Sequence, residues 1–291
     1  MKPAAFDYFA PESLEEALSL LGKHSSNAKL LAGGQSFVPM ANFRVLRPEV
    51  VIDLNRIAAL GFIAERDGAL AIGAMVRHRA VERSELVRAR CPLIAQAVPN
   101  IGHAVIRNRG TIGGSLSHSD PAAEWPVVAI ALEATMVARS PRGERLIPAA
   151  GFFVGLLTTS LADDEILVEI RFPVAPARTG AEFLEISRRH GDFALVSVGA
   201  QVTLSNAGAI DDIRLALGGV GPFPFDAWAL AKRLVGSTPQ ASDLEALGAE
   251  VAKRIEPPSD LHASAEYRKE VAGVLVVRAL RVALARAGEK A

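Results

Sequence analysis

The chain contains 291 residues, of which 50% are hydrophobic and 22% are charged, a composition that predicts a folded globular protein with a large core. Lysine plus arginine and aspartate plus glutamate each total 32, so the formal net charge is +0, which argues against nucleic acid or an anionic membrane surface as the main partner. Cys91 is the single cysteine, which excludes a disulfide within the chain and an iron–sulfur or zinc site built from several of its thiolates.

The N-terminal segment lacks the apolar core of a signal peptide, and no apolar run is long enough to span a bilayer. We therefore expect a cytoplasmic protein without a membrane span. The length predicts one large domain or two medium ones.

The first half of the chain is predicted to mix helices with short strands. Ser13 and Glu16 fit a capping box, and Gly22 suits the end of the helix that follows. Asp67-Gly68 is a hairpin turn signal. Strands are expected at 29–32, 50–54, 62–64, 70–72, 135–139 and 165–172, and helices at 77–87, 93–98 and 126–134.

The second half of the chain begins after a segment rich in Pro and Gly at 173–180, which is the best linker candidate. Three strands are expected after it, at 183–188, 195–204 and 210–220, followed by helices at 226–234, 242–255 and 265–286. Strands followed by helices predict an α+β domain with helices packed on an antiparallel sheet.

Two glycine segments are the strongest candidates for a binding site. The first is Ala32-Gly33-Gly34-Gln35-Ser36, directly after an expected strand, and the second lies within 107–126. Adjacent glycines allow backbone N–H groups to approach a ligand, and a run of such donors suits an anion such as a phosphate. A single glycine pair is more often a structural turn. Two segments of similar composition predict one site that binds a phosphorylated cofactor through backbone amides.

Other common signatures are absent from the sequence. It contains no G-x-G-x-x-G after a strand and no phosphate-binding loop ending in Gly-Lys-Ser or Gly-Lys-Thr. The six histidines are scattered without the spacing of metal ligands, so no metal site is expected.

Four motifs together resemble the FAD-binding medium subunit of molybdenum hydroxylases, the family that includes carbon monoxide dehydrogenase and xanthine dehydrogenase. The first glycine segment is followed by Val38-Pro39-Met40. The second contains Thr111-Ile112-Gly113-Gly114-Ser115 and continues into His118-Ser119-Asp120-Pro121-Ala122-Ala123. Matching motifs in the second half are 188–194 and 264–268. The resemblance covers essentially the whole chain.

The resemblance implies an α+β fold of two parts. A two-lobed FAD-binding domain of the vanillyl-alcohol-oxidase type would span 1–175, with the lobe boundary near 55–60. A C-terminal flavoprotein domain, with a three-stranded antiparallel sheet and helices, would span 176–291.

The resemblance also implies an oxidoreductase complex. In this family a large subunit carries the molybdenum cofactor, and a small subunit carries [2Fe–2S] clusters. Electrons pass from molybdenum through the clusters to FAD and then to an external acceptor. The single cysteine agrees with clusters held on another chain. The expected assembly is a dimer of heterotrimers in which this chain has no catalytic residue of its own.

Carried over by position, the expected cofactor contacts are Leu30, Leu31, Ala32, Gly33, Gly34, Gln35, Ser36, Phe37, Ile101, Thr111, Ile112, Gly113, Gly114, Ser115, Asp120, Glu124, Leu167, Phe193 and Leu195. Segments 30–37 and 111–115 would surround the pyrophosphate, and Ile101 would pack against the flavin. Glu124 would lie near the ribose or adenine, with Asp120 as a second candidate, and Leu167 would border the adenine.

Phe193 and Leu195 would lie over the isoalloxazine, and both depart from patterns in the family. Related carbon monoxide enzymes often have tyrosine where Phe193 stands, so a hydroxyl is lost while the stacking surface is kept. Members that use NAD place lysine where this chain has Leu195, which weakens the case for NAD as the acceptor.

Two other classes of function fit part of the sequence. A stand-alone flavin oxidase of the same FAD-binding fold would need an acid or base near the flavin. Tyr8 and Tyr267 lie near the two ends of the chain, which leaves His190 as the candidate. A nucleotide-binding regulatory module would explain the glycine segments but not the match in the second half.

Overall fold

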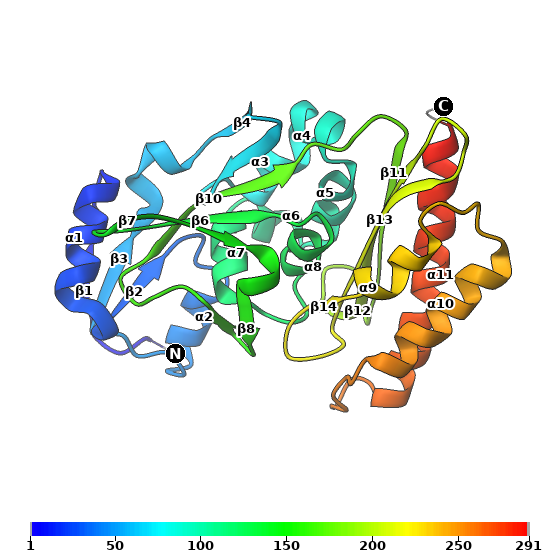
Figure 1. The fold of residues 1–291 in the computed structure, drawn as a ribbon. Helices are drawn as coiled ribbons and strands as arrows, with labels where there is room; N and C mark the ends of the chain where they lie inside the picture. The colour runs from blue at the N-terminus through cyan, green and yellow to red at the C-terminus, as the bar shows by residue number, and fades with distance from the viewer. Residues whose placement is uncertain (1, 290–291) are drawn as a thin grey trace.

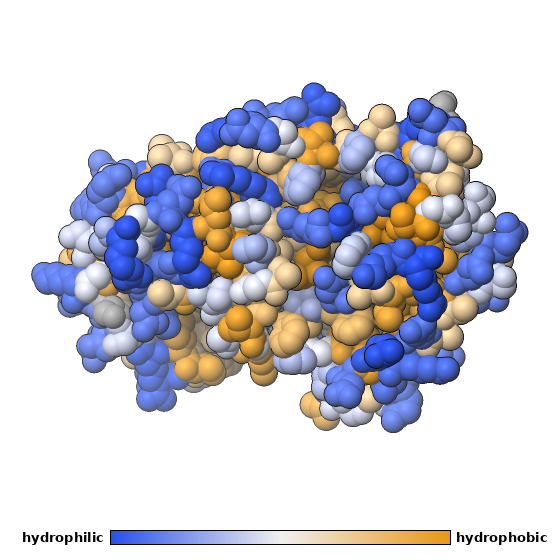
Figure 2. Space-filling view, in the orientation of Figure 1, coloured by the Kyte–Doolittle hydropathy of each residue, from blue (hydrophilic) through white to orange (hydrophobic). Residues whose placement is uncertain are grey.

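Three large β-sheets and a two-stranded one organise the chain, in a computed structural model that describes residues 2–289. The sheets follow one another along the sequence, from the blue N-terminal lobe through the cyan and green middle to the yellow and red C-terminal part (Figure 1). Hydrophilic residues dominate the two ends of the view in Figure 2, and apolar residues appear between them.

The first lobe contains a parallel three-stranded sheet in the order β1-β3-β2, with strands β1 (Asp7–Phe9), β2 (Ala28–Leu31) and β3 (Val50–Asp53). Its helices are α1 (Leu14–His24) and α2 (Phe37–Asn42). The Ser13 hydroxyl accepts a hydrogen bond from the Glu16 N–H at 3.1 Å, and the Glu16 carboxylate accepts one from the Glu12 N–H at 3.1 Å. Helix α1 continues past Gly22, where the sequence predicted its end.

The second lobe contains an antiparallel five-stranded sheet in the order β4-β5-β10-β6-β7. Its strands are β4 (Ile63–Arg66), β5 (Ala69–Gly73), β6 (Thr135–Ser140), β7 (Gly143–Pro148) and β10 (Ile166–Pro173). Its helices are α3 (His78–Arg83), α4 (Glu85–Arg90), α5 (Pro92–Ala97), α6 (Ala104–Arg107), α7 (Ile112–His118) and α8 (Glu124–Ala131), and a small hairpin joins β8 (Phe153–Gly155) to β9 (Thr158–Thr159).

The prediction of one helix over 77–87 is wrong. Ser84 is extended, with φ −75° and ψ 117°, and its side chain accepts a hydrogen bond from the Val87 N–H. This cap starts α4 as a separate helix. The hairpin turn at Asp67-Gly68 is confirmed, because β4 and β5 pair across it.

The C-terminal part contains an antiparallel sheet in the order β11-β12-β13-β14, formed by β11 (Thr179–Ser187), β12 (Ala194–Leu204), β13 (Ile210–Gly218) and β14 (Phe225–Asp226). The three long strands are those the sequence predicted. The two-residue β14 at the edge was not predicted. Helices α9 (Trp228–Ala231), α10 (Ala241–Arg254) and α11 (Ala265–Glu289) follow the strands.

The C-terminal sheet is covered on both faces. Helix α11 packs on β11 and β12, while α8 of the second lobe packs on β12 and β13 (Figure 1). Gly180 permits the first contact, because a Cβ there would lie 2.0 Å from the Ala283 carbonyl oxygen. At the second contact, the Gly219 N–H donates to the Pro121 carbonyl oxygen at 2.8 Å. This sheet therefore connects the C-terminal helices to the segment that follows α7.

Short 3-10 helices connect several elements: η1 (Ser25–Asn27), η2 (Leu54–Arg56), η3 (Ala58–Leu60), η4 (Val98–Asn100), η5 (Ala149–Gly151) and η6 (Lys232–Leu234).

Cys91 is buried, with 1% of its surface exposed, and burial raises the pKa of its thiol to about 12. Of the helices within residues 2–289, none combines the length and the apolar character needed to cross a membrane.

Candidate cofactor site

The first glycine segment connects β2 to α2. Gly34 has a φ of +76°, a conformation that glycine adopts without penalty. Within residues 2–289, the backbone N–H groups of Gly34, Gln35 and Ser36 donate to no protein acceptor, and the Ser36 hydroxyl does not cap α2. Three consecutive unpaired donors on a partly exposed loop favour the binding of an anion.

The second glycine segment forms a helix and not an open loop. Residues 112–118 form helix α7, and Thr111 caps it by accepting a hydrogen bond from the Gly114 N–H at 3.2 Å. The Gly113 N–H donates to the Ala74 carbonyl at 2.9 Å, and the Ile112 N–H donates to the Val76 carbonyl at 3.1 Å. These amides stabilise the fold and are not free for a ligand.

The structure brings the two segments into direct contact. A Cβ on Gly33 would lie 2.5 Å from the Arg109 carbonyl oxygen and 2.7 Å from the Gly110 Cα. A Cβ on Gly114 would lie 3.3 Å from the Ala32 Cβ. Glycine is therefore required at Gly33 because two stretches of backbone touch there.

The loop at 188–194 lies against the turn that follows Ile101. A Cβ on Gly191 would lie 2.5 Å from two ring atoms of His103, so this loop rests on the turn after Ile101. Ile101 is buried, whereas the Phe193 ring is 65% exposed. Leu195 is also buried, at the start of β12.

Arg107 organises the turn at Ile101 from inside the protein. Its guanidinium donates to the carbonyl oxygens of Pro99, Ile101 and Gly102 at 3.1, 3.2 and 2.8 Å. It also forms a salt bridge with Glu82 at 3.1 Å. This arginine is occupied by the fold and is not a free cation beside the glycine segment.

Asp120 and Glu124 have different surroundings. The Asp120 carboxylate accepts a hydrogen bond from the Ala122 N–H at 2.9 Å, which closes the turn before α8. Glu124 begins α8 and is 6% exposed. Burial, and next the negative charge of Glu185, raise the pKa of Glu124 to about 8. Its carboxyl group is therefore held mostly neutral at pH 7.

Leu167 lies inside the second lobe. It pairs with Ala138 in the sheet, is 4% exposed, and packs in the main hydrophobic core. The ladder shifts register between Leu167 and Glu169. Its side chain is therefore buried in this core.

His78 and Trp125 form a buried pair under the second segment. The Trp125 Nε1–H donates to His78 Nδ1 at 3.0 Å, and a Cβ on Gly110 would lie 2.7 Å from the His78 ring. Burial, with the nearby charges of Arg107 and Arg77, lowers the pKa of His78 to about 3. The neutral imidazole accepts this bond and supports Gly110. Residues 2–289 contain no cluster of three or more His, Cys, Asp or Glu that could hold a metal.

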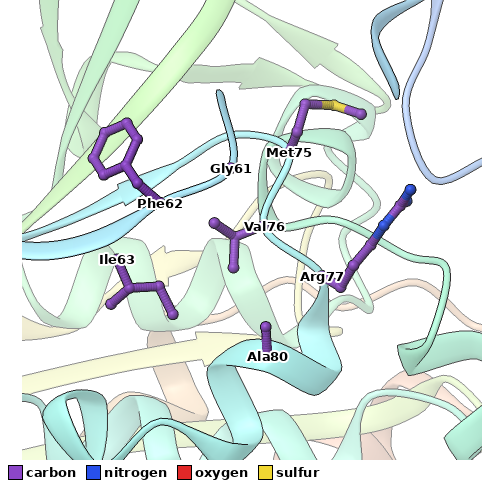
Figure 3. Close-up of a pocket in the computed structure, with 7 residues that line it drawn as sticks. All are labelled: Gly61, Phe62, Ile63, Met75, Val76, Arg77 and Ala80. Atoms are coloured by element: carbon purple, nitrogen blue, oxygen red, sulfur yellow. The ribbon is translucent and has the colours of Figure 1, made fainter. Parts of the chain in front are cut away.

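An apolar pocket of about 410 Å³ lies beside this region on the second lobe, lined by Gly61, Phe62, Ile63, Met75, Val76, Arg77 and Ala80. In Figure 3 the Arg77 side chain points away from Phe62 and Ile63. Sequence reasoning did not identify Arg77 or its partner Asn55. Neither belongs to a motif, and only the fold brings them to the glycine segments.

Comparisons with known proteins agree over nearly the whole chain. A family described as "FAD binding domain in molybdopterin dehydrogenase" matches residues 4–175, and one described as "CO dehydrogenase flavoprotein C-terminal domain" matches residues 181–283. The 6-hydroxypseudooxynicotine dehydrogenase complex subunit alpha of Paenarthrobacter nicotinovorans is 40% identical, with 99% of this chain and 97% of that protein covered. Caffeine dehydrogenase subunit beta of a Pseudomonas species is 41% identical, covering 96% and 95%.

A solved structure gives the same result for the fold. A chain of the carbon monoxide dehydrogenase from Hydrogenophaga pseudoflava, in a form that lacks the Mo-pyranopterin moiety of the molybdenum cofactor, superposes with a TM-score of 0.96. It is 40% identical, and the match covers 98% of this chain and 99% of that chain.

Proposed function

Because the chain belongs to the family of FAD-binding medium subunits of molybdenum hydroxylases, we propose that it transfers electrons from [2Fe–2S] clusters of a partner subunit, through its FAD, to an external acceptor. The observation that carries the cofactor assignment is the set of three amides at Gly34, Gln35 and Ser36 that have no acceptor among residues 2–289, beside a second backbone segment in contact with Gly33.

The residues present suit the pyrophosphate of FAD. A diphosphate needs several hydrogen-bond donors, and consecutive backbone N–H groups supply them at short range. The contact between Gly33 and Gly110 allows the two segments to form one wall of backbone with no Cβ between them. The amides of α7 are already paired, so we assign most of the phosphate contacts to the first segment and side-chain contacts to Ser115.

We assign the following residues to the cofactor site: Leu30, Leu31, Ala32, Gly33, Gly34, Gln35, Ser36, Phe37, Ile101, Thr111, Ile112, Gly113, Gly114, Ser115, Asp120, Glu124, Leu167, Phe193 and Leu195. FAD supplies the redox chemistry, and the chain supplies its position and surroundings. The exposed Phe193 ring, on a loop that rests on the turn after Ile101, supports a place for the isoalloxazine between these two residues.

The flavin domain is proposed to span residues 1–175, with its lobe boundary near 55–60, and the C-terminal domain residues 176–291. One hydrophobic cluster lies wholly within residues 184–284 and supports the C-terminal domain. The cluster of the first lobe also includes Met75, Val137, Ile166 and Val168 of the second lobe, so the two lobes share a core. The family matches, which end at residue 175 and begin again at 181, also support it.

The partners are an iron–sulfur small subunit and a molybdenum-binding large subunit, assembled as a dimer of heterotrimers in the cytoplasm. Names of relatives that include "complex subunit", "subunit beta" and "medium chain" support a multi-subunit assembly. The relatives act on chemically different substrates, which is consistent with substrate selection by another chain of the complex.

The purified chain tests the cofactor assignment, and the complex tests the electron transfer. We expect a yellow protein that releases FAD and not FMN on denaturation, and that co-purifies with an iron–sulfur chain and a molybdenum chain. Substrate added to the complex without an acceptor should bleach the flavin absorption. A colourless chain that gains no FAD on reconstitution contradicts the proposal, and oxidation of a small alcohol by the isolated chain would favour a stand-alone oxidase.

A further inference from the structure

A clamp of two side chains lies behind the glycine segments. The Arg77 guanidinium donates to the Arg109 carbonyl oxygen and to the Asn55 side-chain oxygen. The Asn55 Nδ2–H donates in turn to the Ala32 carbonyl oxygen at 2.9 Å. The two carbonyls at the ends of this chain belong to the residues just before Gly33 and just before Gly110, the glycines that touch.

Asn55 is itself fixed by the first lobe. Its N–H donates to the Asp53 Oδ1 at 2.9 Å, and the Tyr8 hydroxyl donates to Asp53 Oδ2 at 2.5 Å. Asp53 ends β3, the central strand of the first sheet. Arg77 follows β5 of the second lobe. The clamp therefore connects the two lobes at the point where the glycine segments meet.

We propose that Arg77 is a positioning residue for the pyrophosphate of FAD: it fixes the spacing of the two glycine segments through the Arg109 carbonyl and Asn55, and places a cation behind them. This inference rests on the proposed FAD site. A guanidinium presents several donors in a rigid planar fork, so one side chain can hold acceptors from two lobes. A lysine ammonium keeps the charge but loses this fork.

The charge of Arg77 is not neutralised by a direct partner, since among residues 2–289 it forms no salt bridge. Partial burial and the positive charge of Arg109 lower its pKa, while the negative charge of Asp53 opposes that change. A diphosphate on the glycine segments would offset the repulsion between Arg77 and Arg109. The cation that ties the two segments together thus also favours an anion in front of them.

The test compares FAD binding by the full chain and its variants, measured by quenching of flavin fluorescence after removal of the bound cofactor. Arg77→Ala should weaken FAD binding by about 10- to 100-fold, because two hydrogen bonds from a charged donor are lost. Asn55→Ala should weaken it by a similar factor. Arg77→Lys, which keeps the charge and most of the side chain, should give a smaller loss.

Two measurements separate positioning from general destabilisation. The double variant Arg77→Ala/Asn55→Ala should bind FAD within about threefold of the weaker single variant, because residues of one network are not additive. Arg56→Gln is the matched control: it removes one positive charge next to Asn55, from a side chain that is 65% exposed and 3.8 Å from Glu12. It should bind FAD within about twofold of the wild type.

The proposal is overturned if Arg77→Ala and Arg77→Lys both bind FAD within twofold of the wild type. It is also overturned if the loss of FAD binding in the double variant equals the sum, in free energy, of the losses in the two single variants. If Arg77→Ala does not fold, the Arg77→Lys and Asn55→Ala pair decides. A wild-type chain that binds no FAD would overturn the proposed function instead, so the two failures are distinguishable.

Discussion

The two glycine segments have similar sequences but opposite uses of their backbone. In the first segment, the N–H groups of Gly34, Gln35 and Ser36 have no acceptor within the described residues. In the second, the N–H groups of Gly113 and Gly114 are bonded to Ala74 and Thr111. Glycine in the first segment leaves donors available, and glycine in the second lets a helix pack closely on the second lobe.

This difference shows that a glycine pair by itself does not identify a ligand-binding loop. At Gly113, a Cβ would lie 2.4 Å from the Ala74 Cβ, so glycine is required by packing. At Gly34, the nearest atom would be a Val38 methyl at 3.3 Å, and the positive φ is the stronger requirement. The two segments should therefore respond differently to the same substitution.

The largest expected effect is loss of stability in Gly113→Ala. The added methyl group would overlap the Ala74 backbone, and we expect the free energy of unfolding to fall by about 3 kcal/mol. Urea denaturation measures it. Gly151→Ala is the control, because a Cβ there meets nothing within 4 Å, and it should change stability by less than about 0.5 kcal/mol. Equal stability of the two variants would show that α7 does not depend on close packing.

The second expected effect is a pH dependence of stability caused by Glu124, which belongs to the second segment. Burial raises the pKa of Glu124 from 4.5 to about 8, so the folded state holds a proton that the unfolded state releases. The contribution of Glu124 to the free energy of unfolding is therefore complete below pH 4.5 and is lost as the pH rises through about 8. Between these two pH values the free energy of unfolding falls by about 1.4 kcal/mol per pH unit for one proton.

Urea denaturation at a series of pH values measures this effect. Glu124→Gln should flatten the loss of stability above pH 4.5, because the amide cannot ionise. The exposed Glu15→Gln variant should follow the wild type. Parallel curves for Glu124→Gln and the wild type would show that the carboxyl is not buried as described. Burial also raises the pKa of Glu185 to about 7, so this residue accounts for any dependence of stability on pH that remains in the Glu124→Gln variant.

A third effect distinguishes strain from ligand contact in the first segment. Gly34→Ala places a side chain at a φ of +76°, which costs about 1 kcal/mol of stability. Gly68→Ala imposes the same strain at a φ of +74° in the β4–β5 hairpin and is the matched control. Both should lose similar stability, but only Gly34→Ala should weaken FAD binding. Normal FAD binding by Gly34→Ala would remove the first segment from the site.

The smallest expected effects are those of substitutions at Thr111, which precedes α7, and at Ser36, which precedes α2. Thr111→Val removes a helix cap and should cost about 1 kcal/mol, whereas Thr111→Ser should keep it. Ser36 makes no cap bond, so Ser36→Ala should change stability by less than about 0.5 kcal/mol. Ser36→Ala should instead weaken FAD binding by about threefold. A stability loss in Ser36→Ala equal to that in Thr111→Val would contradict the difference between the segments.

Local patterns predicted much of the fold because they depend on nearby residues. The capping pair Ser13 and Glu16, the hairpin turn at Asp67-Gly68 and the three long strands of the C-terminal sheet were all predicted at or near their observed positions. The helix expected at 77–87 was divided by the cap at Ser84, a competing local signal that helical periodicity alone did not weigh.

The sequence by itself determined the element types, the two glycine segments and the family motifs, because spacing, turn residues and apolar periodicity are local properties. Only the tertiary structure decided which glycine amides are free, because that depends on acceptors such as the Ala74 carbonyl from a distant strand end. It also placed Arg77 and Asn55 behind both segments. Their hydrogen bonds join residues 22 to 32 positions apart, and no local pattern encodes contacts over that separation.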